Sequence, residues 1–144
     1  NELDLKKYKT SNLDPHQSPL FWKSVNSLQL FSETKNNLLR AVVPPANCEK
    51  VMNNIKNKFK YFIDWSGSLF WIEVPGKDDD KLKEVKKMIL QNNGYLTIIK
   101  KSEEFDFSEK IFTIDDTKLM ISKKIKESFD PKGIFNPGKM YKDF

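Results

Sequence analysis

Hydrophobic and polar residues follow two different periods between residues 38 and 101, and the order of these periods predicts a fold. Four segments are β-branched or alternate with period two, and two segments between them place apolar residues at helical spacing. The strands are expected at about 38–43, 61–65, 69–74 and 95–99, and the helices at about 47–59 and 78–93. This order predicts an α+β, ferredoxin-like βαββαβ core over residues 38–101, with four antiparallel strands and both helices on one face.

Prolines, glycines and acidic residues mark the ends of these elements. Pro44 and Pro45 end the first strand, because proline gives no hydrogen to a strand ladder. The segment Ser66–Ser68 reads as the turn of a hairpin. The run Asp78–Asp80 favours the positive end of a helix dipole, and Gly94 is expected as the C-terminal cap of the same helix.

The core is flanked by two segments of different character. Residues 1–37 are polar with Pro15 and Pro19, and we expect them to be irregular. Residues 102–144 are expected to form a connection, a helix capped by Asp115 or Asp116, and an ordered Gly/Pro-rich tail, within one compact domain overall. In that helix we predict that the apolar residues turn inward, namely Leu119, Ile121, Ile125 and Phe129. The lysines are predicted to face water, namely Lys118, Lys123, Lys124 and Lys126.

Composition narrows the possible chemistry. The chain of 144 residues has a net charge of +5, but Arg40 is its only arginine among 25 basic residues. Base readout and two-pronged phosphate binding rely on arginine, so we expect no nucleic-acid partner. Cys48 alone excludes an internal disulfide, and His16 alone excludes motifs with two histidine ligands, so we predict no metal. There is no apolar run long enough to span a bilayer, and the start at Asn1 suggests a fragment or a processed product.

The most specific pattern lies near the end of the chain. Residues 129–140 read FDPKGIFNPGKM. A turn that ends a helix would explain two or three of these residues but not the whole run. The run closely resembles FDP-x-GI-x-NPG, the C-terminal signature of FAD-linked oxidases of the vanillyl-alcohol-oxidase type.

Further segments extend the resemblance over roughly residues 20–144. They occur in the same order as in the FAD-binding E subunit of bacterial glycolate oxidases, and the Ile-Asp-Trp-x-Gly segment is the most specific to it. The segments are Phe21–Trp22, Leu39–Pro44, Ile63–Gly67 and Leu69–Trp71.

The resemblance implies the cap domain of a flavoprotein subunit. Such a subunit passes a hydride from glycolate, or a similar small 2-hydroxy acid, to FAD, and the cap covers the flavin and shapes the substrate pocket. Most of the FAD would be bound by an N-terminal domain absent from this chain, so that domain and other glycolate-oxidase-type subunits are the expected partners. The isolated chain is expected to be inactive. The expected location is the cytoplasm or the inner face of the cell membrane.

Carried over to this chain, the resemblance makes Asn136 the candidate for a polar contact to the flavin, with its backbone set by Pro137 and Gly138. A simple turn-forming role for Asn136 explains the sequence equally well. The catalytic residues stay unassigned. His16 is a possible proton acceptor, although a solvated loop histidine is the simpler interpretation.

Three residues are candidates for binding the substrate. The guanidinium of Arg40 can hold a carboxylate with two parallel hydrogen bonds, and every 2-hydroxy acid carries that group. The simpler interpretation is an edge-strand arginine that faces water or pairs with Asp64 or Glu73. Asp64 and Trp65 could line a pocket, but a hairpin edge with a tryptophan in the core is the commoner arrangement.

Two departures from the family pattern qualify the substrate. Residues 93–96 read Asn-Gly-Tyr-Leu where the glycolate oxidase subunit commonly shows Gly-Gly-His-Ala. No glycine-rich phosphate-binding loop precedes the strands. A basic ferredoxin-like binding module for nucleic acid or protein, and a dimerisation domain that uses the free face of the sheet, remain as alternatives.

Overall fold

The computed structural model describes residues 12–103, 112–113 and 115–138, and the chain divides into two units between Glu33 and Thr34. The first unit contains helix α1, Gln17–Asn26, followed by a 3-10 turn at Gln29–Phe31. The expectation of an irregular segment and of one compact domain was therefore wrong. Pro19 does not prevent the helix, because it lies in the first turn of α1, where a missing N–H breaks no helical hydrogen bond.

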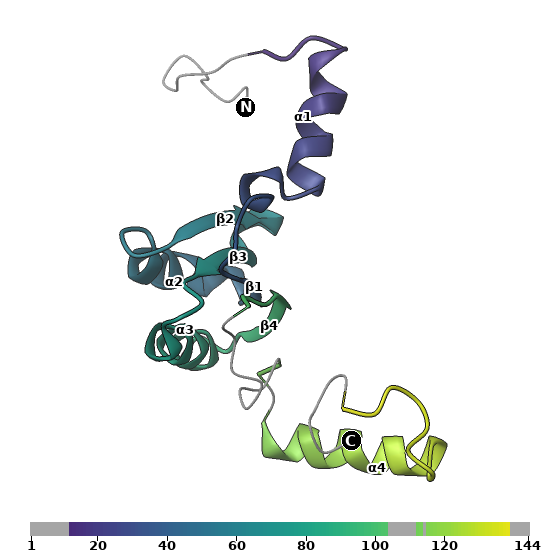
Figure 1. Ribbon diagram of the computed structural model, residues 1–144. Coiled ribbons are helices and arrows are strands. Elements are labelled where there is room, and N and C mark those ends of the chain that lie inside the picture. Colours follow the sequence, from purple (N-terminus) through teal and green to yellow (C-terminus); the bar gives the residue numbers. More distant parts are fainter. Residues whose placement is uncertain (1–11, 104–111, 114, 139–144) are drawn as a thin grey trace. The chain divides into compact units, whose positions relative to one another are not determined.

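The second unit is built on a four-stranded antiparallel sheet in the order β2-β3-β1-β4. Its elements along the chain are β1 Asn37–Val42, α2 Cys48–Ile55, β2 Lys60–Asp64, β3 Leu69–Val74, α3 Asp79–Gln91 and β4 Tyr95–Lys100. Both α2 and α3 lie on the same side of the sheet (Figure 1). The predicted βαββαβ fold is confirmed, with β1 and β3 as the two inner strands.

The hydrophobic core lies between the sheet and these two helices. Alternate residues of each strand point toward the helices, as the period of two requires. The core contains Leu39, Ala41, Val43, Val51, Ile55, Phe59, Phe70, Ile72, Val74, Leu82, Val85, Ile89, Leu96 and Ile98. The intervening strand residues therefore point to the opposite side, which we call the second face of the sheet.

Helix α2 is shorter than its apolar spacing predicts. The helix ends at Ile55, and the next residues form a turn in which the N–H of Phe59 donates to the carbonyl of Ile55 at 3.0 Å. Phe59 still reaches the core from this turn, with only 9% of its surface exposed. The spacing thus identified the buried residue correctly but not the end of the helix.

The corner between α3 and β4 depends on two neighbouring residues with different roles. Asn93, with φ of 56°, takes the left-handed position that the sequence had assigned to Gly94. The N–H of Gly94 donates to the carbonyl of Ile89 at 2.9 Å, and that of Asn93 to the carbonyl of Leu90 at 3.0 Å, which together close a Schellman motif. Gly94 is required for space instead, since a Cβ there would lie 2.6 Å from the carbonyl oxygen of Val42.

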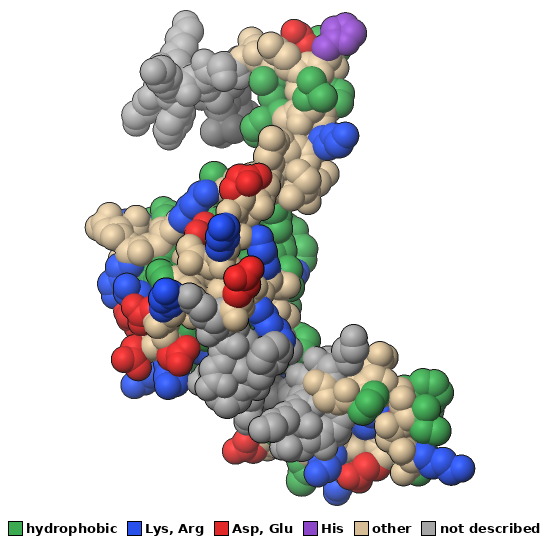
Figure 2. All heavy atoms as spheres, viewed as in Figure 1, with side chains coloured by type: hydrophobic (Ala, Val, Ile, Leu, Met, Phe, Trp, Pro, Cys, Tyr) green, Lys and Arg blue, Asp and Glu red, His purple; other side chains and the backbone are tan. Residues whose placement is uncertain are grey.

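The C-terminal helix α4 spans Asp116–Phe129 and is capped by Asp115, whose side chain accepts a hydrogen bond from the N–H of Lys118. The prediction that its apolar residues turn inward was wrong for Ile121, Ile125 and Phe129, which are about half exposed or more. None of the α4 residues belongs to the core cluster of the sheet. Hydrophobic side chains accordingly reach the surface at this helix (Figure 2).

Part of the connection before α4 extends the sheet. Thr113 donates its N–H to the carbonyl of Leu96 at 2.9 Å, and Phe112 forms a bridge with Thr97, on the side of β4 away from β1. Most of the expected connection at 102–114, and the tail after Gly138, lie outside the described residues. Within the described ranges, no helix has both the length and the apolar character to cross a membrane.

We expect Gly94→Ala to lower the free energy of unfolding of the sheet unit by about 1–3 kcal/mol, because the added methyl group meets backbone as well as the Val43 side chain. Urea unfolding followed by circular dichroism measures this loss. Asn93→Gly is the matched control, and we expect it to be neutral or slightly stabilising because it removes left-handed strain. Equal stability of Gly94→Ala and the parent chain would contradict the close approach at this corner.

Candidate functional site

Arg40 lies near the middle of the second face of the sheet. Its strand β1 is an inner strand, so the interpretation as an edge-strand arginine was wrong. In register, Trp71 on β3 and Thr97 on β4 lie directly opposite Arg40 on either side, and Phe62 on β2 lies opposite Trp71. Directly opposed residues of an antiparallel pair share a face and lie about 5 Å apart at Cβ. We call these four residues, which cross all four strands, the Arg40 row.

Trp65 covers the guanidinium of Arg40. The Arg40 Cζ lies 5.1 Å from the centre of the Trp65 ring, a cation–π distance. Trp65 is 56% exposed, so the expected core tryptophan is instead a surface residue. The structure thus brings together two of the three predicted substrate-binding residues, which lie 25 positions apart in the chain.

The turn that carries Trp65 is conformationally strained. It is a 3-10 turn at Trp65–Gly67 in which Trp65, Ser66 and Gly67 have φ of 50°, 52° and 90°. A positive φ at a residue as bulky as tryptophan is a genuine outlier. Strain of this kind persists only where neighbouring contacts impose it, and it is often found at functional sites.

Two contacts hold this turn. The Asp64 Oδ1 accepts a hydrogen bond from the Trp65 N–H at 2.7 Å. A Cβ at Gly67 would lie 2.7 Å from the Cys48 Sγ, so only glycine fits beneath the turn. Asp64 therefore positions the backbone of Trp65, and its contact with substrate stays a prediction.

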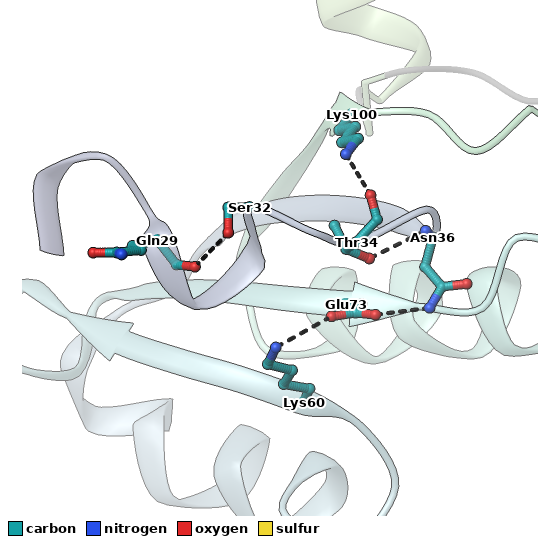
Figure 3. Close-up of polar contacts among 7 residues, drawn as sticks. All are labelled: Gln29, Ser32, Thr34, Asn36, Lys60, Glu73 and Lys100. Atoms are coloured by element: carbon teal, nitrogen blue, oxygen red, sulfur yellow. Dashed lines mark hydrogen bonds and ion pairs between the residues drawn. The ribbon is translucent and has the colours of Figure 1, made fainter. Parts of the chain in front are cut away.

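The Arg40 guanidinium forms no ion pair or hydrogen bond with any other described residue, so none of these residues occupies its N–H groups. Glu73, one of the two expected partners, accepts a hydrogen bond from the Asn36 Nδ2 at 2.7 Å and lies 4.0 Å from the Lys60 Nζ. Figure 3 shows this network, in which Lys100 also donates to the carbonyl of Thr34. The acidic residues near the second face are thus engaged elsewhere.

The net positive charge does not form a basic face in the view of Figure 2. Lysines and acidic residues are interspersed over the part of the molecule that contains α2 and α3. Two of the ion pairs there join Lys58 to Glu84 at 2.6 Å and Lys81 to Asp78 at 2.9 Å. Such a mixed surface is ordinary for a soluble domain and gives no argument for a polyanion partner.

The tail motif is organised by Asp130, which follows the last residue of α4. Its Oδ1 accepts the N–H of Ile134 and its Oδ2 accepts the N–H of Phe135, both at 2.9 Å. Lys126, one turn earlier, forms an ion pair with the same carboxylate and donates to the carbonyl of Phe135 at 2.8 Å. Lys126 therefore does not face water as predicted, because it closes this loop.

The hydrogen bonds lower the pKa of Asp130 from its ordinary value of 3.8 to about 2. The largest cause is the hydrogen bond from the Lys126 ammonium, followed by the N–H groups of Ile134 and Phe135, while burial acts in the opposite direction. The carboxylate is thus charged at neutral pH and holds the loop shut.

Beyond Asp130 the backbone turns at residues with positive φ. Gly133, Asn136 and Gly138 have φ of 61°, 48° and 67°. Residues 131–138 are all exposed, and the Asn136 amide forms no hydrogen bond within the described residues. The loop therefore presents Asn136, Pro137 and Gly138 at the surface in a defined conformation.

A comparison with protein-family models matches residues 108–140 to FAD linked oxidases, C-terminal domain. The C-terminal part of this chain is similar to that domain. The match includes α4 and the whole tail loop, and it begins just before the residues that bridge to β4. It covers less than half of the chain. Comparisons with curated proteins and with solved structures give no match.

FAD is the cofactor of this family, and the tail fits a limited contact with it. The Asn136 amide, exposed and without a partner among the described residues, offers both a donor and an acceptor to a flat polar ring such as flavin. No described residues form a glycine-rich loop that leads into a helix, the usual cradle for a pyrophosphate. Among the described residues of the tail loop, Asn136 would be the one to contact the cofactor.

The remaining candidates have less support from the geometry. His16 is exposed at the start of α1, where its N–H donates to the Asp14 Oδ1 at 2.8 Å. Among the described residues there is no group of three histidines, cysteines or acidic residues that could hold a metal ion. The assignments of substrate-binding and cofactor-binding residues stay predictions.

Sequence reasoning missed several contributors to these two regions. Phe62 could have been found from the period of two, since it lies two positions before Asp64, whereas Trp71 is placed beside Arg40 only by the register of β1 and β3. Asp130 and its partner Lys126 have i, i+4 spacing, which is the signal for their ion pair.

We expect the tail loop to open between about pH 4 and pH 2. The folded pKa of Asp130 lies below its unfolded value, so its stabilisation is complete above the unfolded pKa and is lost as the pH falls through about 2. NMR titration of the Asp130 carboxyl carbon and of the Ile134 and Phe135 amides measures this. A carboxyl midpoint at the ordinary value of 3.8 would contradict the loop.

Asp130→Asn should open the same loop at neutral pH, because an amide cannot accept two N–H groups and a lysine as a carboxylate does. The Ile134 and Phe135 amides should then show hydrogen exchange about tenfold faster or more. Glu127→Gln removes an acidic charge from the same helix turn and should leave both amides protected. Unchanged exchange in Asp130→Asn would show that the loop does not depend on the carboxylate.

Proposed function

We propose that this chain is the cap and C-terminal part of an FAD-dependent oxidoreductase that oxidises a small 2-hydroxy acid, in the manner of the glycolate oxidase FAD-binding subunit. The proposal rests mainly on the tail: residues 108–140 match the C-terminal domain of FAD linked oxidases. The loop in that match has a defined shape, and the Asn136 amide has no hydrogen-bond partner among the described residues. An unrelated helix-terminating turn would need neither.

The second face of the sheet supplies the element that a 2-hydroxy acid requires. Arg40 is the only arginine of the chain, lies at the middle of this face, and has no carboxylate partner among the described residues. A guanidinium binds a carboxylate through two parallel hydrogen bonds, which fixes the direction of the rest of the molecule. In the proposed enzyme Arg40 holds the substrate carboxylate, and Trp65 holds the guanidinium in place.

In the proposed enzyme the work of the reaction is divided between this chain and a flavin-binding domain outside it. The bound FAD supplies the acceptor for the hydride that leaves the hydroxyl-bearing carbon. This chain orients the substrate through Arg40, and Asn136 contacts the cofactor from the tail. The hydroxyl proton goes to a base that lies outside the residues assigned here.

The proposal is tested on the full polypeptide that contains this chain, purified with any co-expressed subunits. We expect a flavin spectrum in the visible range that is bleached when glycolate or another 2-hydroxy acid is added without oxygen. A colourless protein that takes up no added FAD would refute the proposal. A flavoprotein bleached by NADH and by no hydroxy acid would refute the substrate class alone.

Asn136→Ala should weaken FAD binding about tenfold, the usual effect of losing one good hydrogen bond. Fluorescence titration of the apoprotein with FAD measures the dissociation constant. Lys132→Ala changes an exposed residue of the same loop and should leave FAD affinity unchanged. Equal affinity in Asn136→Ala and the parent protein would leave Asn136 as a turn-forming residue only.

A further inference from the structure

The surroundings of Arg40 point to a narrower substrate class than the family resemblance does. We propose that the second face of the sheet binds a 2-hydroxy acid with an aromatic side group, such as 3-phenyllactate, in preference to glycolate. The carboxylate would bind Arg40 and the aromatic ring would lie against Trp65 and Trp71. This inference rests on the proposed function, of which it specifies the substrate.

The positive charge of Arg40 favours a small anionic ligand on this face. Arg40 is half-buried, and both acidic residues considered as its partners are engaged: Glu73 by Asn36 and Lys60, and Asp64 by the backbone of Trp65. A half-buried guanidinium without a carboxylate partner is an electrostatically incomplete site. A single carboxylate supplies the missing charge and matches its donors.

The apolar part of this face favours a ligand that carries a flat aromatic ring. Trp71 lies directly opposite Arg40 and Phe62 lies beyond it, while Trp65 covers the guanidinium from the turn after β2. The exposed Tyr95 and Ile99 extend this apolar area along β4. Glycolate has two carbons and would cover little of this surface, whereas an aromatic ring on the substrate would cover more of it.

The residue directly opposite Arg40 on β4 is polar, which orients the ligand. Thr97 lies there on β4, half-buried, and its hydroxyl forms no hydrogen bond with the other described residues. The hydroxyl of a bound 2-hydroxy acid lies next to the carboxylate, within reach of such a neighbour. The ring then points to the tryptophan side and the hydroxyl to the threonine side.

The strained turn prepares the site before a ligand arrives. Trp65 takes a left-handed φ of 50° with its N–H tied to Asp64, and Gly67 is the only residue that fits against Cys48. These contacts limit the freedom of the Trp65 ring in the free protein. A ring fixed in advance loses little entropy on binding, so the contact adds to affinity.

The test uses the 144-residue chain labelled with ¹⁵N, which contains three tryptophans with separate indole signals. Addition of 3-phenyllactate should shift the Trp65 and Trp71 signals. Glycolate should bind about tenfold more weakly, and 2-phenylethanol, which lacks the carboxylate, should also bind more weakly. Trp→Phe variants assign the signals.

Two variants with the same loss of charge separate the specific effect from a general one. Arg40→Gln should weaken 3-phenyllactate binding at least tenfold, while Lys83→Gln, on the exposed side of α3, should not. The amide spectrum verifies that each variant is folded. The comparison of the three ligands on the parent chain stays decisive if Arg40→Gln does not fold.

Three results would overturn the inference: no shift of Trp65 and Trp71 up to about 10 mM 3-phenyllactate, equal binding of glycolate, or tighter binding of a single-stranded oligonucleotide on the same signals. Its failure is distinct from failure of the proposed function. A full-length flavoprotein bleached by glycolate but not by 3-phenyllactate would keep the function and reject the aromatic substrate. A colourless protein would reject the function, whatever the indole signals show.

Discussion

Two helices can cover only one face of a four-stranded sheet, and this constraint arranges the second unit of the molecule. Because side chains of a strand alternate between faces, each residue of β1 is assigned either to the core or to the second face. Leu39 and Ala41 are fully buried, and Arg40 between them must point the other way. A slip of one residue would bury the guanidinium, so core packing also keeps Arg40 on the second face.

The order of elements in the sheet unit was predictable because it depends on period alone, and both periods are unambiguous there. The ends of the elements were less predictable, because they depend on tertiary contacts that the sequence does not show. Asn93 and Gly94 illustrate the difference: both favour turns, and only the approach of β1 decides which one takes the left-handed position. Helix α1 was missed because prolines were counted without regard to their place within a first turn.

The two candidate sites also differ in how far the sequence predicts them. The tail could be identified from its residues, because Gly and Pro at fixed offsets determine a local shape. The contact of Arg40 with Trp65 could not, since it depends on the order β2-β3-β1-β4 and on an unusual backbone at Trp65. Sequence patterns rank a tryptophan as a core residue, and a strained turn places this one at the surface.

The place of β1 inside the sheet also has a consequence for folding of the chain during its synthesis on the ribosome. One side of β1 pairs with β3, which follows soon after it, but the other side pairs with β4, where Leu39 lies opposite Ile98. Until residue 100 has left the exit tunnel, a nascent chain has β1 as an edge strand with unpaired N–H and C=O groups. Folding of this unit is therefore completed only after synthesis of its last strand, and a pause in translation before β4 would prolong the period in which that edge is open to wrong partners.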